Sequence, residues 1–265
     1  EQIGGQFRFA MQIPGKEEFA ETLRYYQRQL ELHKVEVKLN ASVEATDLMS
    51  YDEVVIATGV VPRIPDIPGI ERAVPYSDVL SGKVVPGKRV AVIGAGGIGV
   101  DVSIWLTHTE ETLDDWLAHW GVGDPAEHRG GLKPREPRSH AREVYLVQRK
   151  ATPIGINLGK TSGWAHRDVL KQSGVTLITG AIYEDIDEYG LQITVNSEPH
   201  LIQADTVIVC AGQESVRGLY DQLLALGYPE GQLKLIGGAD VAAELDAKRA
   251  IRQGLETAIE AKELS

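Results

Sequence analysis

A strand, a glycine-rich turn and a helix follow one another within residues 88–107, and this succession constrains the fold more than any other feature. The apolar strand at 89–93 leads directly into Gly94, Gly96 and Gly99. The first glycine permits the tight turn, the second lets a pyrophosphate approach the backbone, and the third lets the helix pack closely against the strand. The helix start adds free N–H groups that favour phosphate. We predict a dinucleotide-binding turn, with an ordinary βα turn as the alternative, formed by Gly94, Ala95, Gly96, Gly97, Ile98 and Gly99.

The strand that follows ends in two cations, which bear on the choice between NAD and NADP. An NAD site presents an acidic residue at the end of this strand to bind the ribose 2′-hydroxyl. Here the strand ends in Gln148, Arg149 and Lys150, and arginine binds a 2′-phosphate in bidentate fashion. The spacing from Gly99 is longer than usual, because residues 109–142 intervene. We predict NADP(H) as the cofactor, with a solvated basic turn as the alternative.

Strands alternate with helices along the chain, which is typical of a doubly wound parallel sheet in an α/β fold. We predict strands at 35–39, 52–57, 89–93, 143–148, 175–178 and 205–211, a β-rich stretch at 182–195 and a short strand within 233–240. We predict helices from the glycine turn onward and at 16–33, 109–120, 165–172 and 247–262. A loop spans 121–142, and the proline-rich connection at 62–68 excludes sheet pairing there.

Two strands end alike, in Val-Val-Ile-Ala-Thr-Gly at 54–59 and in Val-Ile-Val-Cys-Ala-Gly at 207–212. This repetition indicates two related, Rossmann-like nucleotide-binding units in one chain, with one unit inserted in the other. We place the inserted unit at 81–228 and the surrounding unit at 1–80 and 229–265.

An acidic residue, Asp240, follows the apolar strand at the C-terminal end and precedes a helix. An aspartate in this place hydrogen-bonds a flavin ribityl chain while the helix start faces the flavin or its pyrophosphate. A simple helix N-cap is the alternative on spacing alone.

Composition excludes several classes of function. The net charge of −11 disfavours nucleic acid and anionic membranes, since both need a basic surface. The single cysteine, Cys210, cannot form an intramolecular disulfide, a zinc cluster or an iron–sulfur cluster, and its apolar neighbours predict a buried core residue. Neither a metal site nor a membrane span nor a signal peptide has support in the sequence, so we expect a cytoplasmic protein.

Catalytic constellations of side chains are missing. The sequence has neither a Tyr-x-x-x-Lys pair nor a Gly-x-Ser-x-Gly elbow. Hydride transfer between a nicotinamide and a flavin needs no acid or base from the protein, because the cofactors carry the chemistry. We therefore name no catalytic side chain.

Several longer motifs resemble one family. They are Ile-Gly-Gly-Gln-Phe at 3–7, Gln-Ile-Pro-Gly-Lys-Glu-Glu-Phe at 12–19, Val-Gln-Arg-Lys at 147–150, Leu-Gly-Lys-Thr at 158–161 with Gly-Trp at 163–164 and His-Arg at 166–167, Cys-Ala-Gly-Gln-Glu at 210–214, and Ile-Gly-Gly at 236–238 with Asp240 and Ala-Glu-Leu-Asp at 243–246. Over essentially the whole chain they resemble the C-terminal part of bacterial NADPH-dependent 2,4-dienoyl-CoA reductases. Enzymes like trimethylamine dehydrogenase share the architecture more loosely.

The resemblance implies an FAD domain of the glutathione-reductase type with an NADPH domain inserted into it. In the whole enzyme NADPH reduces FAD, and electrons pass through a 4Fe–4S cluster to FMN in an N-terminal (β/α)₈ barrel, where a dienoyl-CoA is reduced. The barrel with its FMN and iron–sulfur cluster is then the expected partner of this chain.

The resemblance also assigns residues to the cofactors. It implies FAD contacts at Gln6, Lys16, Val43, Ala57, Thr58 and Gly59, and it places the flavin half of FAD against Gly238, Asp240, Ala250 and Ile251. It implies NADPH contacts at Gly94–Gly99, Gln148, Arg149 and Lys150, with further cofactor contacts at Ala211, Gly212 and Gln213.

The chain opens on Glu1 and reads as a fragment or a processed chain. By the resemblance, the first FAD strand, its glycine turn and the acid for the FAD ribose would precede Glu1. Their loss is expected to expose apolar surface and to remove a pyrophosphate-binding helix start. We therefore expect weak or absent FAD binding by this chain alone.

Two segments and two rival functions stay open. Residues 160–167 are either functional or a surface loop leading into a helix, and the basic loop at 129–142 either docks the barrel or a CoA phosphate or is solvated. The rivals are a stand-alone NADPH:flavin reductase and a non-catalytic NADP(H)-binding module.

Overall fold

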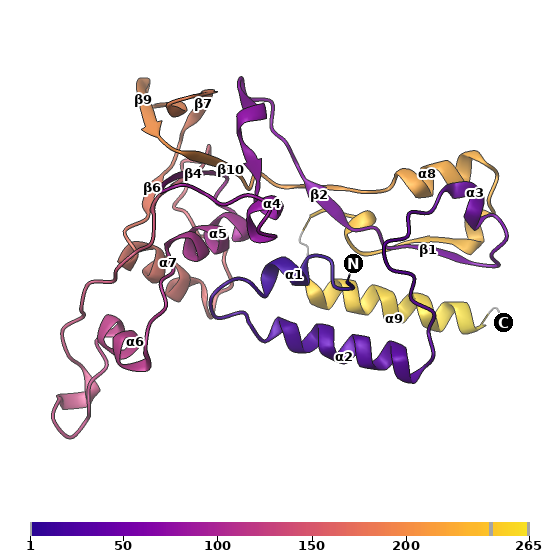
Figure 1. Cartoon of the computed structure of the whole chain (residues 1–265), viewed down its shortest axis with the longest axis horizontal. Helices are drawn as coiled ribbons and strands as arrows, with labels where there is room; N and C mark the ends of the chain where they lie inside the picture. Colours follow the sequence, from indigo (N-terminus) through magenta and orange to yellow (C-terminus); the bar gives the residue numbers. More distant parts are fainter. Residues whose placement is uncertain (1, 244–245, 264–265) are drawn as a thin grey trace. The chain divides into compact units, whose positions relative to one another are not determined.

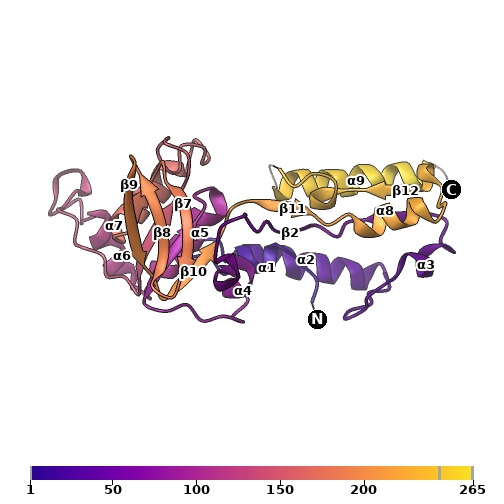
Figure 2. The same cartoon turned by 90° about the horizontal axis from the view of Figure 1, so that it is seen from above.

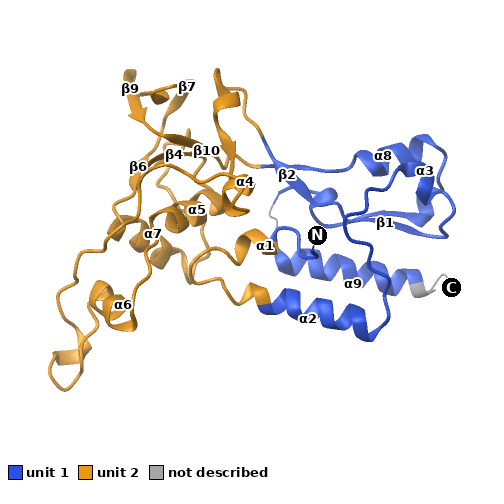
Figure 3. Cartoon of the chain, in the orientation of Figure 1, with its two compact units in different colours: residues 1–6, 21–63, 213–265 blue, residues 7–20, 64–212 orange. Residues whose placement is uncertain are grey.

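The computed structural model describes residues 2–243 and 246–263 and divides into two compact units (Figures 1 and 3). Unit 1 comprises residues 1–6, 21–63 and 213–265, and unit 2 comprises residues 7–20 and 64–212. Unit 2 thus interrupts unit 1 in the sequence, as the predicted insertion requires. The domain boundaries at 80 and 228 stay predictions, because compactness does not say which nucleotide a segment binds. Glu244 and Leu245 of the motif at 243–246 lie outside the described residues.

The centre of unit 2 is a five-stranded parallel sheet in the order β3, β10, β4, β5, β6. These strands span Val74–Pro75, Thr206–Val209, Arg89–Ile93, Glu143–Val147 and Thr176–Ile178. Parallel strands covered on both faces read as unbroken apolar runs, and residues 90–93 of β4 have no exposed surface. The carboxyl ends of the strands therefore meet at one edge, where sheets of this kind bind ligands.

Successive residues of β4 face two different hydrophobic clusters. Val90 and Val92 pack with apolar residues of α5 (Gly97–Thr107) and α7 (Gly163–Gln172). Ala91 and Ile93 pack with a three-stranded antiparallel sheet (Figure 2). Its strands β7, β8 and β9 span Ile182–Asp187, Gly190–Val195 and Glu198–Gln203. The parallel sheet is thus covered by helices on one face and by a β-meander on the other.

An inserted helix, α6 (Leu113–Trp120), stands between α5 and β5. The side chains of Thr112 and Asp115 each accept the other residue's backbone N–H, so Thr112 is the N-cap. This cap explains why the helix begins at Leu113 and not at the predicted residue 109. The smaller elements of unit 2 are α1 (Phe7–Ala10), η1 (Ile70–Arg72), α4 (Tyr76–Leu80) and η2 (Arg129–Gly131).

Unit 1 contains two small sheets and its own core. In the first sheet, β1 (Val54–Ile56) pairs in parallel with β12 (Leu233–Leu235). In the second, β2 (Val60–Pro62) pairs antiparallel with β11 (Gln213–Ser215). The helical segments are α2 (Phe19–Leu32, of which residues 21–32 belong to unit 1), α3 (Ala45–Leu48), α8 (Gly218–Ala225), η3 (Glu230–Gln232), η4 (Gly237–Ala239) and α9 (Ala247–Glu263). One face of β1, with Val54 and Ile56, packs into a cluster that includes Leu223 of α8.

Apolar side chains of unit 1 stay exposed on the other face of β1 and on α9. Val55, between the two buried residues of β1, is 43% exposed. On α9, Ile251, Leu255 and Ile259 follow one another at helical spacing and are all exposed. No residue of the amphipathic helix α2 is buried. Unit 1 therefore carries uncovered apolar side chains on these three elements.

Most of the predicted elements form, with ends shifted by a few residues. The prediction of a strand at 35–39 is wrong, because no neighbouring strand pairs with it and Val35, Val37 and Leu39 are exposed. The exclusion of pairing at 62–68 is wrong for Pro62, which closes β2 opposite Gln213 at a strand end. Within the described residues, no helix is long and apolar enough to cross a membrane.

Candidate dinucleotide-binding site

Gly94 and Gly99 stand where the backbone leaves no room for a side chain. Gly94 has a φ of +100°, and a Cβ there would lie 2.5 Å from the carbonyl oxygen of Cys210. A Cβ on Gly99 would overlap the carbonyl oxygen of Gly94 and lie 3.4 Å from the side chain of Leu146. The two glycines thus let the turn pack directly against β5 and the end of β10.

The middle of the turn faces open space. Gly96 is the N-cap of α5, and a Cβ on Gly96 or Gly97 would meet no atom within 4 Å. Both glycines are exposed, whereas Ala95 and Ile98 pack against the core of unit 2. The first N–H groups of the helix lack intrahelical acceptors, so they are available to an anion. These residues fit the pyrophosphate of a dinucleotide.

Arg149 and Lys150 are exposed in a turn that the side chain of Gln148 holds. Gln148 Nε2 donates to the carbonyl oxygen of Lys150 at 3.0 Å and to that of Thr152. The backbone of Gln148 donates to Ile178 and accepts from the N–H of Ala181. Two cations on a fixed turn suit a phosphate group. Gln148 therefore shapes the turn, while Arg149 and Lys150 offer the charge.

The end of β10 lies beside the glycine turn. The N–H of Cys210 donates to the carbonyl oxygen of Ile93, which joins β10 to the last residue of β4. Cys210 is buried, as the sequence predicts, and burial raises the pKa of its thiol, so it stays protonated. Gly212 has a φ of +105°, and the next residue, Gln213, begins β11. Ala211 packs against the second cluster of unit 2.

In unit 1, the loop after β1 is joined to the chain after β11. The N–H of Val216 donates to the carbonyl oxygen of Gly59, and Thr58 Oγ1 donates to the carbonyl oxygen of Val216. Gly59 has a φ of +74° and open space where a Cβ would stand. Ala57 and Thr58 are exposed. This loop offers backbone and free volume to a ligand.

Asp240 lies at the end of η4, beside a glutamine that sequence reasoning did not find. Gln253 of α9 accepts the N–H of Gly237 at 2.9 Å and donates to Asp240 Oδ2 at 3.4 Å. Ser215 Oγ donates to the carbonyl oxygen of Gly238 at 2.7 Å. The Gly-Gly turn ahead of Asp240 is thus held from two sides. Asp240 itself is exposed and available to a hydroxyl group.

Of the remaining predicted flavin contacts, all but Lys16 lie on the surface of unit 1. Gln6, Val43, Ala250 and Ile251 are exposed, and the last two lie three and four residues after the start of α9. Lys16 belongs to unit 2, where its Nζ donates to Asp101 Oδ2 at 2.6 Å. Asp101 was not expected at the site; its one signal in the sequence is its place two residues after Gly99.

Much of the positive charge of the basic loop is used inside unit 2. Arg138 pairs with Glu111, and Arg135 pairs with Asp168 at 2.7 Å. Arg142 donates to the carbonyl oxygens of Gly87 and Leu106.

The segment 160–167 carries structural contacts, since Arg167 donates to the carbonyl oxygen of Gly155 at 2.9 Å and the ring of Trp164 lies edge-on to that of Trp120. Lys160 is exposed. Among the residues that the structure describes, no group of His, Cys, Asp and Glu side chains is arranged to hold a metal ion.

A parallel sheet with an open glycine turn at its carboxyl edge is typical of dinucleotide-binding domains. The chain belongs to the pyridine nucleotide-disulphide oxidoreductase family, whose model matches residues 6–234. It is therefore a flavin-dependent pyridine nucleotide oxidoreductase module. The family name refers to disulphides, yet a redox pair of cysteines cannot form within this sequence, because it holds only Cys210.

The chain is similar to parts of larger enzymes. It is 26% identical over 231 residues to a metal reductase of Desulforamulus reducens, covering 84% of this chain and 34% of the relative. It is 23% identical over 218 residues to a cinnamate reductase of Clostridium sporogenes, covering 80% of this chain and 28% of that protein.

Solved structures show the same fold. A 2-naphthoyl-CoA reductase complex aligns with a TM-score of 0.75 at 23% identity, covering 95% of this chain and 33% of that chain. A histamine dehydrogenase from Rhizobium sp. 4-9 aligns with a TM-score of 0.64 at 17% identity, covering 92% and 34%. The chain thus spans about a third of the length of these proteins, whose shares covered are 28% to 34%.

Proposed function

We propose that this chain is the NADPH:FAD electron-input module of a 2,4-dienoyl-CoA reductase-like flavoenzyme and passes a hydride from NADPH to FAD. The observation that carries the proposal is the exposed Arg149–Lys150 turn beside an open glycine turn at the carboxyl edge of one parallel sheet. Gly96 and Gly97 leave room for the pyrophosphate, and the two cations meet the 2′-phosphate.

The preference for NADPH rests on charge. Asp and Glu are absent from residues 148–152, where an NAD site would offer a carboxylate to the ribose. The guanidinium of Arg149 binds a dianionic 2′-phosphate through two parallel hydrogen bonds, and an uncharged 2′-hydroxyl gains far less from it.

The flavin half of the site belongs to unit 1. The loop at 57–59, the Gly-Gly turn ahead of Asp240 and the first turns of α9 are the places that fit an isoalloxazine and its ribityl chain. A bound flavin supplies the redox chemistry, accepting a hydride from the nicotinamide and passing electrons on. The protein then needs only to bind and orient the two cofactors and to exclude water from them, and none of these tasks requires a catalytic acid or base.

We expect FAD to bind weakly to this chain alone. The glycine turn at 94–99 belongs to unit 2, and the described residues of unit 1 contain no turn of the Gly-x-Gly-x-x-Gly type between a strand and a helix. The FAD pyrophosphate therefore lacks the helix N-terminus that normally holds it. The exposed apolar side chains of β1 and α9 suit packing against a further segment of the same fold.

The partner in this proposal is a barrel domain that carries FMN and a 4Fe–4S cluster and reduces a dienoyl-CoA. Support comes from the motifs that resemble that family and from the fact that the chain spans about a third of its relatives, with 34% and 28% of their lengths covered. One relative is named a cinnamate reductase, and cinnamate has a carbon–carbon double bond conjugated to a carboxyl group, as a dienoyl thioester has next to its carbonyl.

The test is the visible spectrum of the chain with FAD added, followed by NADPH without oxygen. Bleaching of the flavin band, at a rate that rises with the concentration of the chain, is the expected result. An artificial electron acceptor added afterwards is then reduced only while NADPH lasts. If NADPH is bound but neither free nor bound flavin is reduced, the chain is a non-catalytic NADP(H)-binding module and the proposal fails.

A further inference from the structure

One buried carbonyl oxygen joins three elements of the proposed NADPH site. The carbonyl of Val147, the last residue of β5, accepts the N–H of Gly94 at 2.8 Å. It also accepts the phenol of Tyr183 from β7 at 3.0 Å. Val147 has no exposed surface and lies two residues before Arg149. The glycine turn and the β-meander therefore meet at a single oxygen atom, which belongs to the residue directly ahead of the basic turn.

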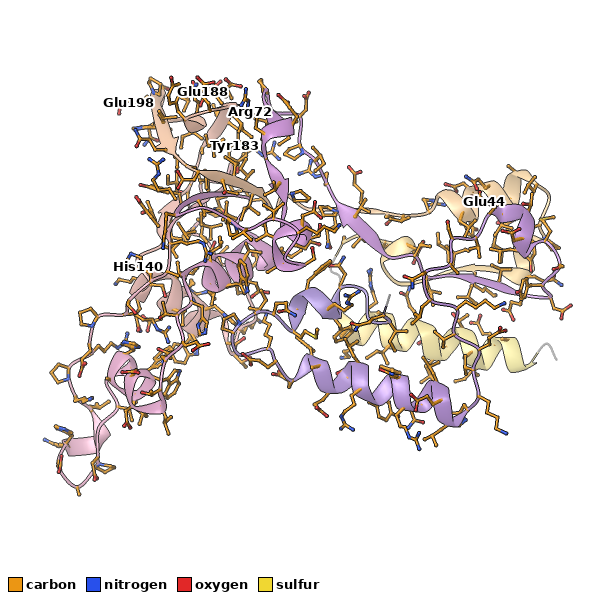
Figure 4. The ribbon with its side chains drawn as sticks, in the orientation of Figure 1. Glu44, Arg72, His140, Tyr183, Glu188 and Glu198 are labelled. Carbon is orange, nitrogen blue, oxygen red and sulfur yellow. The ribbon has the colours of Figure 1, made fainter. Side chains whose placement is uncertain are left out.

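Tyr183 is held in this position by its surroundings. Its ring packs against the cluster that contains Val147 and Ile186. A bulge in the β7–β8 pairing directly follows it, between Tyr183 and Asp185, and bulges re-aim the side chains beside them. Figure 4 shows Tyr183 on the side of unit 2 that carries the meander. The phenol contact is thus set by the packing of β7 and by the bulge beside Tyr183.

The chemistry of the phenol agrees with a permanent donor role. Burial raises the pKa of Tyr183 to about 12, while the nearby charge of Arg149 and a hydrogen bond with the backbone of Gly94 lower it in part. The hydroxyl is therefore protonated at neutral pH and donates to the carbonyl.

We propose that Tyr183 is a positioning residue that sets the preference for the 2′-phosphate of NADPH by holding the end of β5 from which Arg149 projects. This inference rests on the proposed function, since it requires Arg149 to bind that phosphate. Removing the hydroxyl takes away its own contact with the backbone of Gly94, but the N–H of Gly94 keeps its 2.8 Å bond to the carbonyl of Val147, which still anchors the pyrophosphate turn to β5. The loss then falls on the basic turn, and therefore on NADPH and not on NADH.

Two small probes separate the phosphate from the rest of the cofactor: 2′,5′-ADP carries the 2′-phosphate, and 5′-AMP lacks it. Dissociation constants of both are measured by calorimetry on the whole chain and on its Tyr183→Phe variant. We expect 2′,5′-ADP to bind roughly threefold to tenfold more weakly to the variant, the effect of one lost hydrogen bond, with 5′-AMP unchanged. Tyr189→Phe is the matched control, because Tyr189 is 62% exposed at the β7–β8 turn.

A double-mutant cycle with Arg149→Ala decides between positioning and mere packing. If Tyr183 acts through Arg149, Tyr183→Phe has no further effect once Arg149 is gone. An equal loss for both probes, no loss at all, or a loss that persists without Arg149 overturns the inference. If the unaltered chain binds 2′,5′-ADP no better than 5′-AMP, the proposed NADPH preference itself fails, which is a separate result.

Discussion

Lys16 and Asp101 form an ion pair in unit 2 that joins the segment ahead of α2 to the helix after the glycine turn, with Nζ and Oδ2 2.6 Å apart. The two side chains are 28% and 23% exposed, so water screens the pair only in part. The lysine that sequence resemblance assigns to the flavin is thus held by the helix that is expected to carry the NADPH pyrophosphate. This contact places a cation close to the start of α5.

Removing the charge of Lys16 should destabilise unit 2 because Asp101 then loses its partner in a half-buried place. We expect Lys16→Met to lower the free energy of unfolding by about 1–2 kcal/mol. Urea unfolding of this variant, of Asp101→Asn and of the double variant measures the coupling. A coupling energy close to zero would show that the pair contributes nothing to stability.

Alanine at Gly96 should separate binding from folding. A Cβ there meets no atom of the protein, so we expect the free energy of unfolding to change by less than about 1 kcal/mol. The same methyl group stands in the volume that we assign to the pyrophosphate, so NADPH affinity should fall at least roughly tenfold. Calorimetry with NADPH and thermal unfolding report the two effects.

Gly99→Ala should have the opposite effect to Gly96→Ala, because it should impair folding. Its Cβ would overlap the backbone oxygen of Gly94, and neither atom can move freely. We expect this variant to lose about 3 kcal/mol or more, or to fail to fold. A Gly99→Ala protein as stable as the wild type, or a Gly96→Ala protein with full NADPH affinity, would contradict this account of the turn.

Arg149→Ala tests the assignment of NADPH over NADH. Loss of a bidentate, charge-assisted contact should raise the dissociation constant of NADPH roughly tenfold to hundredfold and leave that of NADH nearly unchanged. Arg28→Ala, at an exposed ion pair on α2, is the control. If the dissociation constant of NADPH is the same in the Arg149→Ala variant as in the wild type, the charge of Arg149 does not set the preference for NADPH.

Acid stability should depend on Asp205, which connects β10 to the start of β4. Its pKa is lowered, first by the hydrogen bond from the Arg89 side chain and then by backbone N–H groups of Arg89 and Lys88. A carboxyl whose pKa is lower in the folded state stabilises the protein above its unfolded pKa, about 3.9, and loses that stabilisation as the pH falls below it.

Asp205→Asn should therefore be less stable than the wild type at neutral pH and should lose less stability between about pH 5 and pH 3. Urea unfolding at a series of pH values measures both quantities, with the exposed Asp66→Asn as the control. Parallel curves for wild type and Asp205→Asn would rule out this contribution.

The sequence predicts the centre of unit 2 well, because its central strands β4 and β10 are buried on both faces. Residues 90–93 form a continuous apolar run, and β4 has the predicted bounds of 89–93. The turn at 94–99 follows from steric needs that only glycine meets. These signals are local, so they can be read without knowing what packs on the strand.

Features that depend on distant partners were out of reach. The alternation at 35–39 indicates a half-buried strand only if another strand lies beside it, and the described residues supply none. The contact of Tyr183 with Val147 joins residues 36 positions apart, and that of Lys16 with Asp101 joins residues 85 positions apart. Gln253 was missed for the same reason, since it lies on α9 while its partners Gly237 and Asp240 lie in the turn at η4.

The most direct test of the central claim is calorimetric titration of the purified chain with NADPH and, separately, with NADH. The account predicts one saturable NADPH site per chain and clearly weaker binding of NADH, because the Arg149–Lys150 turn has a phosphate to bind only in NADPH. Absence of saturable heat with NADPH, or tighter binding of NADH, would contradict the claim that the turn after β4 and the cations after β5 form an NADP(H) site.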